Sequence, residues 1–382
     1  MDTGFVPPAP LPPRMAARDD DLIWLRLIRS RRVGPATFHR LMNEHGSARA
    51  AFEALPDIAA AAGISDYSPC PEAVAAAELR AGRKAGAKLI RHDSPLYPPA
   101  LRQIDASPPV LWLLGEPDWL TLSPIAVIGA RNASSLGLRM ARGMAVGLGQ
   151  NRHTVVSGLA RGIDAAAHHA ALTTGTVAVL AGGVDIPYPT DNTELLMQIA
   201  SQGAVISEQP PGTVPAARHF PARNRIISGL AEAVVVIEAA HRSGSLITAR
   251  YALDQGREIM AVPGHPMDSR ASGCNQLIRD GAHLVRSAAD VIEALEAQRP
   301  DEPPENATVP GQPVTPPDQA VDCAPPAARE AQILSRLTPS PTEENDLIRE
   351  LGLSAAAANA AILALEIQGR IIRMPGGRIA LT

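Results

Sequence analysis

The sequence predicts an α/β domain built on a doubly wound, mostly parallel sheet, with a small helical region before it and a winged-helix pattern after it. Three observations predict this. Short apolar runs rich in β-branched residues alternate with helical stretches over residues 121–298. Helical patterning dominates residues 21–95. Residues 327–382 read as three helices and then two short strands around a tight turn.

Composition limits the classes of protein that remain. Of 382 residues, 46% are hydrophobic and 19% are charged, so the chain can bury a sizeable core. The formal net charge of −4 excludes a globally basic nucleic-acid binder, so any anion site must be a local patch. The three cysteines, Cys70, Cys274 and Cys323, are too scattered for a C-x-x-C zinc pair or a disulfide framework. We expect a reducing, cytoplasmic setting.

The pattern divides the chain into five parts. The first 20 residues hold five prolines and lack the apolar segment of a signal peptide, and no run is long enough to span a membrane, so we expect no membrane association. The second proline-rich stretch holds nine prolines in residues 299–326 and cannot form a sheet or a long helix. The expected order is a disordered tail (1–20), a helical domain (21–95), the α/β domain (96–298), a linker (299–326) and the winged helix (327–382).

The helical region contains a break at Val33-Gly34-Pro35, as in helix-hairpin-helix or SAM-like domains. Two interpretations stay open. The turn amides, with Arg29, Arg31 and Arg32 nearby, could contact a DNA backbone. Alternatively, the region packs against the next domain and shields it.

Six apolar runs form the expected sheet, and each is short enough to be a strand buried on both faces. Ligands of such folds bind beyond the carboxyl ends of the strands, so function is sought there. The runs are IAVIGA (125–130), TVVSG (154–158), VAVLAGG (177–183), AVISE (204–208), AVVVIEA (233–239) and EIMAVPG (258–264).

The first strand ends in Gly129, Arg131 and a hydroxyl-rich turn that opens a helix. This is neither G-x-G-x-x-G nor a phosphate-binding P-loop, so no dinucleotide or other cofactor is expected. Helix amides and a forked arginine could still bind a phosphate, unless Arg131 only pairs with a surface carboxylate. The second strand ends in Ser157-Gly158, a similar turn.

Acidic and histidine side chains near these turns are expected to be structural. Asp164 and His168 are one helical turn apart, but two ligands are too few for a metal, so no metal site is expected. Asp185 follows the third strand and could orient Arg131 or hold loop amides.

The segment before the AVVVIEA strand is the richest in chemistry. Arg218, Phe220, Arg223, Asn224 and Arg225 read as a cationic loop with one aromatic side chain. Such a loop could follow a single strand, with arginines on phosphates and the ring under a base. The alternative has Phe220 in the core and Arg223 in an internal salt bridge.

After the same strand, Ser243, Gly244 and Ser245 open another helix with amides and hydroxyls. Three or four such cradles along one edge of a sheet suit a polyphosphate or a nucleic-acid strand better than one small phosphate.

Together, the stretches IAVIGARNASSLG, VVSGLARGIDAAAHHAAL, FPARNRIISGLAEAVVVIEA and SGSLITARYALDQGREIMAVPG resemble the DprA (Smf) family of DNA-processing proteins. The resemblance implies a Rossmann-like core that binds single-stranded DNA without sequence preference, between a SAM-like domain and a winged helix. It implies a homodimer that protects incoming DNA and loads the RecA recombinase during natural transformation. Single-strand-binding protein is a further candidate partner.

The family's motifs fall on Arg131, on the F-P-x-R-N-R residues Phe220, Arg223, Asn224 and Arg225, and on the turn of Ser243, Gly244 and Ser245. A lysine that some members carry before the second motif is missing, and Arg218 is the nearest cation.

Two enzyme classes are the rivals. Related phosphoribohydrolases carry a P-G-G-x-G-T-x-x-E loop, but the corresponding turn here has Ala249-Arg250 and no carboxylate, so no catalysis is expected. A dehydrogenase is also disfavoured, because the sequence lacks the G-x-G-x-x-G motif that binds the dinucleotide. In the winged helix, Asn359 is the one good base reader early in the third helix, and Arg370, Arg373 and Arg378 lie in the wing, so we expect contact with protein rather than sequence reading.

Overall fold

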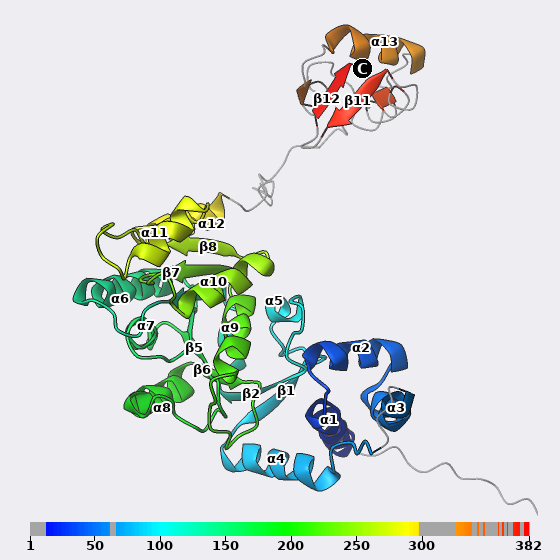
Figure 1. The fold of residues 1–382 in the computed structure, drawn as a ribbon, viewed down its shortest axis with the longest axis vertical. Coiled ribbons are helices and arrows are strands. Elements are labelled where there is room, and N and C mark those ends of the chain that lie inside the picture. The colour runs from blue at the N-terminus through cyan, green and yellow to red at the C-terminus, as the bar shows by residue number, and fades with distance from the viewer. Residues whose placement is uncertain are drawn as a thin grey trace, which may run out of the picture. The chain divides into compact units, whose positions relative to one another are not determined.

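The computed structural model describes residues 13–61, 66–297, 326–337, 342–343, 347, 358, 361–362, 365, 370–374 and 378–381. The chain splits into two compact units, Met1–Glu302 and Pro303–Thr382, which are described separately. Figure 1 shows the fold. Most of the expected tail and linker, residues 1–12 and 299–325, lies outside the described residues.

The first unit begins with four helices: α1 (Pro13–Arg29), α2 (Pro35–His45), α3 (Ala48–Ala61) and α4 (Glu72–Lys84). Residues 13–20 are helical rather than part of a tail, because Pro13 occupies a first helical turn and good helix formers follow it. The break at Gly34 is confirmed: it precedes Pro35 at the start of α2. Gly46 ends α2 at φ 73°, where its N–H donates to the Met42 carbonyl at 2.9 Å.

A nine-stranded sheet follows, in the order β1-β2-β6-β5-β4-β3-β7-β8-β9. The seven strands β3 to β9 run parallel to one another. Strand β2 is antiparallel to β6, and β1 is antiparallel to β2. The strands are β1 (Lys88–Arg91), β2 (Val110–Gly115), β3 (Ile125–Ile128), β4 (Val155–Ser157), β5 (Thr176–Val179), β6 (Ala204–Ser207), β7 (Ala233–Val236), β8 (Glu258–Ala261) and β9 (His283–Leu284).

All six expected strands are present, so the doubly wound parallel core is confirmed. Strand β1 lies inside the range expected to be helical, because its apolar residues Leu89 and Ile90 pair with Trp112 and Leu111 of β2. The sheet therefore begins at Lys88, before the expected boundary at residue 96.

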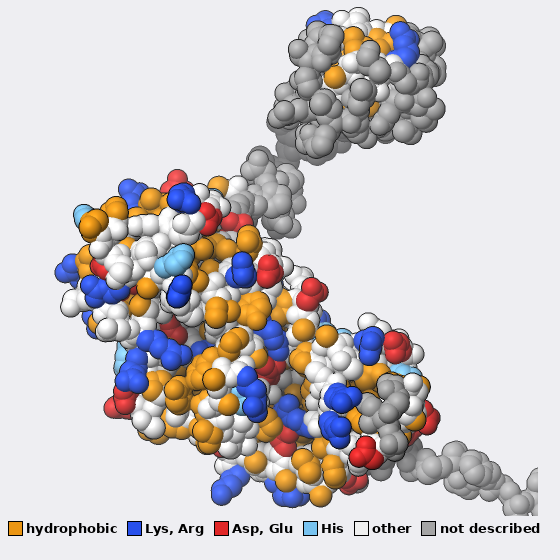
Figure 2. All heavy atoms as spheres, viewed as in Figure 1, with side chains coloured by type: hydrophobic (Ala, Val, Ile, Leu, Met, Phe, Trp, Pro, Cys, Tyr) orange, Lys and Arg blue, Asp and Glu red, His pale blue; other side chains and the backbone are white. Residues whose placement is uncertain are grey.

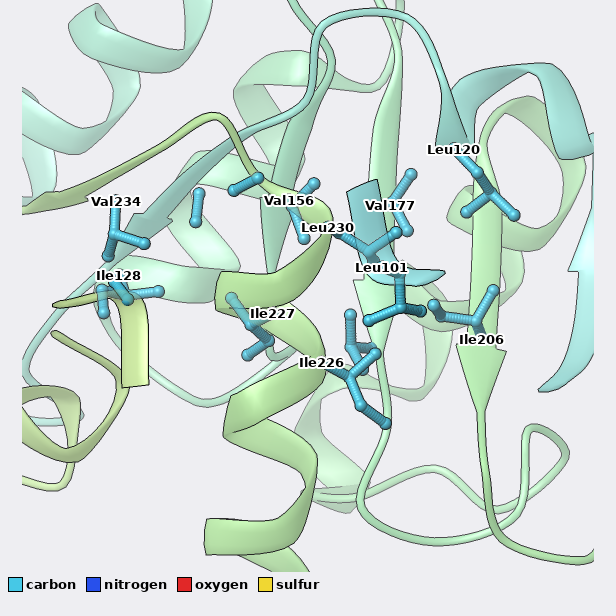
Figure 3. Close-up of a cluster of buried hydrophobic side chains, with 14 of the residues drawn as sticks. Leu101, Leu120, Ile128, Val156, Val177, Ile206, Ile226, Ile227, Leu230 and Val234 are labelled. Carbon is cyan, nitrogen blue, oxygen red and sulfur yellow. The ribbon is translucent and has the colours of Figure 1, made fainter. Parts of the chain in front are cut away.

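Helices cover both faces of the sheet, and side chains alternate between two cores. Val234 and Val236 of β7 join one cluster with α5, α9, α10 and α11 (Figure 3), while Ala233 and Val235 join the other with α6, α7 and α12. The remaining elements are α5 (Pro99–Arg102), η1 (Pro117–Leu120), α6 (Ser135–Gln150), α7 (Ile163–Ala171), η2 (Thr190–Asn192), α8 (Thr193–Gln202), α9 (His219–Leu230), α10 (Ser245–Asp254), α11 (Ser272–Arg279) and α12 (Ala288–Glu296).

The N-terminal helices share a core with the sheet. Trp24 and Phe38 belong to the same buried cluster as Trp112 and Val205. Gly82 of α4 leaves room for the Trp112 ring, since a Cβ there would lie 2.0 Å from a ring carbon. These helices therefore pack on one end of the sheet.

The second unit contains α13 (Pro326–Arg336), β10 (Thr342–Glu343), β11 (Ile371–Met374) and β12 (Arg378–Leu381). The two expected wing strands are confirmed as β11 and β12, and a third short strand, β10, pairs with β12. Ile333, Ile362, Leu365 and Ile379 form its core. Asn359 and the Arg373 and Arg378 side chains lie outside the described residues; Arg370 is exposed.

Candidate nucleic-acid interface

A cleft of about 630 Å³ lies at the carboxyl ends of β3 and β7. It brings together most of the residues expected from the sequence, namely Gly129, Arg131, Phe220, Arg223, Asn224, Ser243, Gly244 and Ser245. Asn132, Arg242 and Arg270 also line it. Figure 2 shows Lys and Arg side chains gathered around the position that α7 has in Figure 1. Arg131, Arg242 and Arg270 give the cleft its positive charge.

An arginine and two aromatic rings lie in contact at this cleft. The exposed Arg131 places its guanidinium carbon 5.4 Å from the Phe220 ring centroid. Phe220 in turn lies 5.4 Å, centroid to centroid, from Tyr188. The sequence reasoning missed Tyr188, although an aromatic residue shortly after a parallel strand was a usable signal.

Arg223 is buried, with 6% of its surface exposed. The segment expected to be a cationic loop is the first half of helix α9, which points this side chain inward. Its Nη1 donates to the Gly158 and Val179 carbonyls, each at 2.6 Å. Burial lowers the pKa of Arg223 to about 10, while the Asp164 carboxylate opposes that shift. Arg223 thus holds the ends of β4 and β5 together, and its Nε, with no hydrogen-bond partner, lies buried at the cleft wall.

The glycines of two predicted turns serve this packing. A Cβ on Gly158 would lie 2.1 Å from Arg223 Nη1, and a Cβ on Gly129 would lie 2.7 Å from Ile163. Gly129 therefore admits a neighbouring helix as well as lining the cleft.

Arg225, Arg218 and Ser157 do not reach the cleft. Arg225 forms an ion pair with Glu208, donates to the Ala106 carbonyl at 2.7 Å, and lines a separate cavity of about 300 Å³. Ser157 is buried and donates to the Val127 carbonyl at 2.7 Å. Arg218 is exposed just before α9.

Carboxylates of the chain itself occupy two of the predicted anion cradles. Glu238 accepts hydrogen bonds from the Ser134 amide, at 2.9 Å, and from the Ser134 hydroxyl at the start of α6. Asp164 accepts from the Gly158 amide at 3.2 Å and the Ala160 amide at 3.3 Å. Asp185 accepts from the Gly212 amide at 2.7 Å, so it holds loop amides rather than Arg131. The expectation of three or four free cradles along this edge is therefore wrong.

The N-terminus of α10 differs, because no carboxylate of the described residues caps it. The Ser243 and Ser245 hydroxyls lie 2.6 Å apart, and the Ser245 amide donates to Ser243 Oγ at 3.3 Å. Gly244 is exposed, and a Cβ there would meet nothing within 4 Å. This ten-residue helix keeps its partial positive charge facing the cleft, beside Arg131.

The buried titratable groups behind the cleft are structural. His168 Nδ1 lies 2.7 Å from Thr176 Oγ1, which itself donates to the Val155 carbonyl, so the histidine donates from Nδ1. Burial, with Arg223 nearby, lowers the pKa of His168 to about 3. Burial raises the pKa of Asp164. No group of three or more His, Cys, Asp or Glu that could hold a metal occurs among the described residues.

No helix within the described parts of the chain is long and apolar enough to cross a membrane.

The fold and the cleft define a Rossmann-like protein whose site suits an anion that carries a flat ring. Family models specify it further. The model for DNA recombination-mediator protein A matches residues 88–296, the DprA-like N-terminal HHH domain matches 18–81, and the DprA winged helix domain matches 315–377. The chain belongs to the DprA (Smf) family.

Individual relatives agree. Protein Smf of Synechocystis is 35% identical over 315 residues, covering 75% of this chain and 78% of the relative. The X-ray structure of DNA processing protein A from Streptococcus pneumoniae is similar at TM-score 0.60 and 36% identity, covering 71% of this chain and 96% of that one. A structure that reports the single-stranded DNA binding mode of DNA processing protein A from Helicobacter pylori matches at TM-score 0.51 and 26% identity, covering 55% and 96%.

Proposed function

We propose that the chain binds single-stranded DNA in the cleft at the carboxyl ends of β3 and β7, without sequence preference. Through this binding it protects incoming DNA and loads RecA onto it during natural transformation and recombination. The observation that carries the proposal is the single cleft that holds an uncapped α10 N-terminus, an exposed Arg131 and the Phe220 ring. The Helicobacter pylori relative, whose structure reports single-stranded DNA binding, supports it.

Each part of the cleft has one task in this proposal. The Ser243–Ser245 turn receives a phosphate on the Gly244 amide and the two serine hydroxyls. Arg131 donates two hydrogen bonds to two oxygens of one phosphate, and the Phe220 ring stacks on a base. Every base has a flat face and every nucleotide has a phosphate, so these contacts discriminate little between sequences.

The proposal is non-catalytic and needs no cofactor. The turn that would carry a phosphoribohydrolase glutamate has Ala249 and Arg250 instead. The acid that lines the cleft, Asp164, is buried and already accepts two backbone amides. We expect no release of adenine from AMP by the purified protein; measurable release would favour the enzyme class.

The decisive test measures labelled oligo-dT binding by fluorescence anisotropy at several salt concentrations, with a duplex of the same length for comparison. Arg131→Ala should weaken oligo-dT binding and flatten the plot of log affinity against log salt by about 0.7. Arg83→Ala, at an exposed position on α4, is the matched control and should leave the slope unchanged. A wild-type slope for Arg131→Ala would place the strand elsewhere.

The proposed role also requires partners: RecA, a second copy of this chain and, as a further candidate, single-strand-binding protein. It places the protein in the cytoplasm, where RecA acts. The α10 and β9 side of the sheet supports a homodimer, since Leu253 and Leu284 are 68% and 49% exposed beside a cavity of about 660 Å³. Leu253→Asp should shift the sedimentation-equilibrium mass from dimer to monomer.

A further inference from the structure

Tyr188 is an exposed aromatic side chain in a small pocket next to the cleft, where it lies with Arg131 and Phe220. It follows β5, is 47% exposed and contacts Phe220 at 5.4 Å between ring centroids. Its hydroxyl makes no hydrogen bond to any residue that the structure describes. Prolines on both sides, Pro187 and Pro189, restrict the backbone that carries it. Packing alone therefore leaves half of this ring in water, where a base could stack on it.

Arg161 lies beside Tyr188, and its guanidinium forms only an exposed surface ion pair. Its side chain is 67% exposed and lies 3.6 Å from Asp191, which is 62% exposed. Such surface pairs contribute little, so a phosphate can replace the carboxylate at small cost. Arg161 and Tyr188 line one small pocket together with Arg131 and Phe220.

These groups follow four neighbouring strands at the carboxyl edge of the sheet. The Ser243–Ser245 turn follows β7, Arg131 follows β3, Arg161 follows β4 and Tyr188 follows β5, and these four strands are neighbours in that order. Three strand spacings of ~4.8 Å give a row of roughly 14 Å, enough for a short stretch of single strand.

We propose that Tyr188 is a second nucleobase platform and Arg161 a second phosphate contact, which extend the single-strand site from Phe220 toward the end of β5. The inference rests on the proposed function, because it concerns the same strand. It adds a stacking position and a direction: the strand crosses the sheet edge from α10 toward Tyr188.

The test uses the full chain and labelled oligo-dT in the anisotropy assay. Tyr188→Ala should weaken binding roughly 5- to 100-fold without changing the salt slope, since stacking on one base is lost but no phosphate contact. Tyr188→Phe keeps the ring and should bind like the wild type. Arg161→Ala should instead lower the slope by about 0.7. Met197→Ala removes a 60% exposed apolar side chain from the nearby α8 and serves as the control.

A second measurement shows whether Tyr188 stacks on a base itself or only positions the Phe220 ring. In a Phe220→Leu background, Tyr188→Ala should still weaken oligo-dT binding several-fold, because the two rings stack on different bases. If the second substitution has no further effect, Tyr188 acts only through Phe220 and the inference is refuted. Normal binding by both Phe220→Leu and Arg131→Ala would refute the proposed function itself. Weak binding by those two with normal binding by Tyr188→Ala would refute the platform alone.

Discussion

At the scale of single residues, burial separates arginines that look alike in the sequence. Arg131 is exposed at the cleft, Arg223 is buried on two backbone carbonyls, and Arg225 is paired with Glu208. The sequence motif that contains Arg223, Asn224 and Arg225 gives no such distinction, because helix α9 turns successive side chains to different surroundings. An arginine's role here follows from the helix face on which it lies.

Arg223→Ala is expected to lower the free energy of unfolding by about 1–3 kcal/mol, because it removes the buried donor to the Gly158 and Val179 carbonyls. Arg131→Ala should change it by less than ~0.5 kcal/mol, as surface substitutions do. Urea unfolding followed by circular dichroism compares the two. A stable Arg223→Ala protein that has lost oligo-dT binding would show instead that Arg223 contacts DNA directly.

His168 should make stability depend on pH. The unfolded chain binds this proton near pH 6.5, whereas the folded chain does so only near pH 3. Between these values the unfolded state holds more protons, so the free energy of unfolding falls as the pH falls, by up to ~1.4 kcal/mol per unit. His168→Met should flatten this dependence in urea melts at pH 4 to 7. His169→Met, at the exposed neighbouring position, should not.

At the scale of elements, the important distinction is between the N-terminus of α6, which Glu238 caps, and that of α10, which no carboxylate of the described residues caps. The sequence shows glycines and hydroxyls after most strands, and local pattern predicts an anion site at each. Glu238, which caps α6, lies 104 residues away from Ser134 in the chain. Such a long-range cap has no local sequence signature, so the sequence could identify the α10 turn but could not select it.

Removing the Glu238 cap and removing the hydroxyls of the Ser243–Ser245 turn should therefore differ in their effect on DNA binding. Glu238→Gln should cost about 1 kcal/mol of stability and leave oligo-dT affinity unchanged, since it weakens only the α6 N-terminus. Ser243→Ala combined with Ser245→Ala should weaken binding, and it should also cost about 1 kcal/mol of stability because the Ser245 amide loses its acceptor. Thermal melts and anisotropy on both variants check this; a reversal of the two outcomes would mean that the phosphate binds at α6.

At the scale of the whole molecule, strand pattern and long-range packing were unequally predictable. Six of the seven parallel strands are apolar runs between turn residues, so the sequence located them, whereas the two-residue strand β9 was not expected. Strands β1 and β2 were missed because they join the sheet antiparallel, outside the repeat of strand and helix. Nor could local pattern show that the N-terminal helices complete the core around Trp112.

Buried polar contacts add to this packing. Glu78 of α4 accepts from Trp112 Nε1 at 3.0 Å and pairs with Arg29 of α1 at 2.9 Å. Arg29 also donates to the Glu208 carbonyl at 3.1 Å, and Glu208 pairs with Arg225 of α9. The N-terminal helices are thus connected to the helix that carries Phe220.

The first compact unit should therefore unfold as one cooperative body. Residues 1–302 should show a single calorimetric transition at the melting temperature of that unit in the full chain, because the second unit lies beyond residue 302. Residues 88–302 should not fold stably, because removal of α1 to α4 exposes Trp112 and leaves Glu208 with fewer contacts. The folding free energy lost in this way is comparable to the ~5–15 kcal/mol that stabilises an ordinary domain. Arg29→Ala in the longer chain should lower the single transition without splitting it. Two separate transitions for residues 1–302, or a cooperative melt of residues 88–302, would mean that the helices form an independent domain after all.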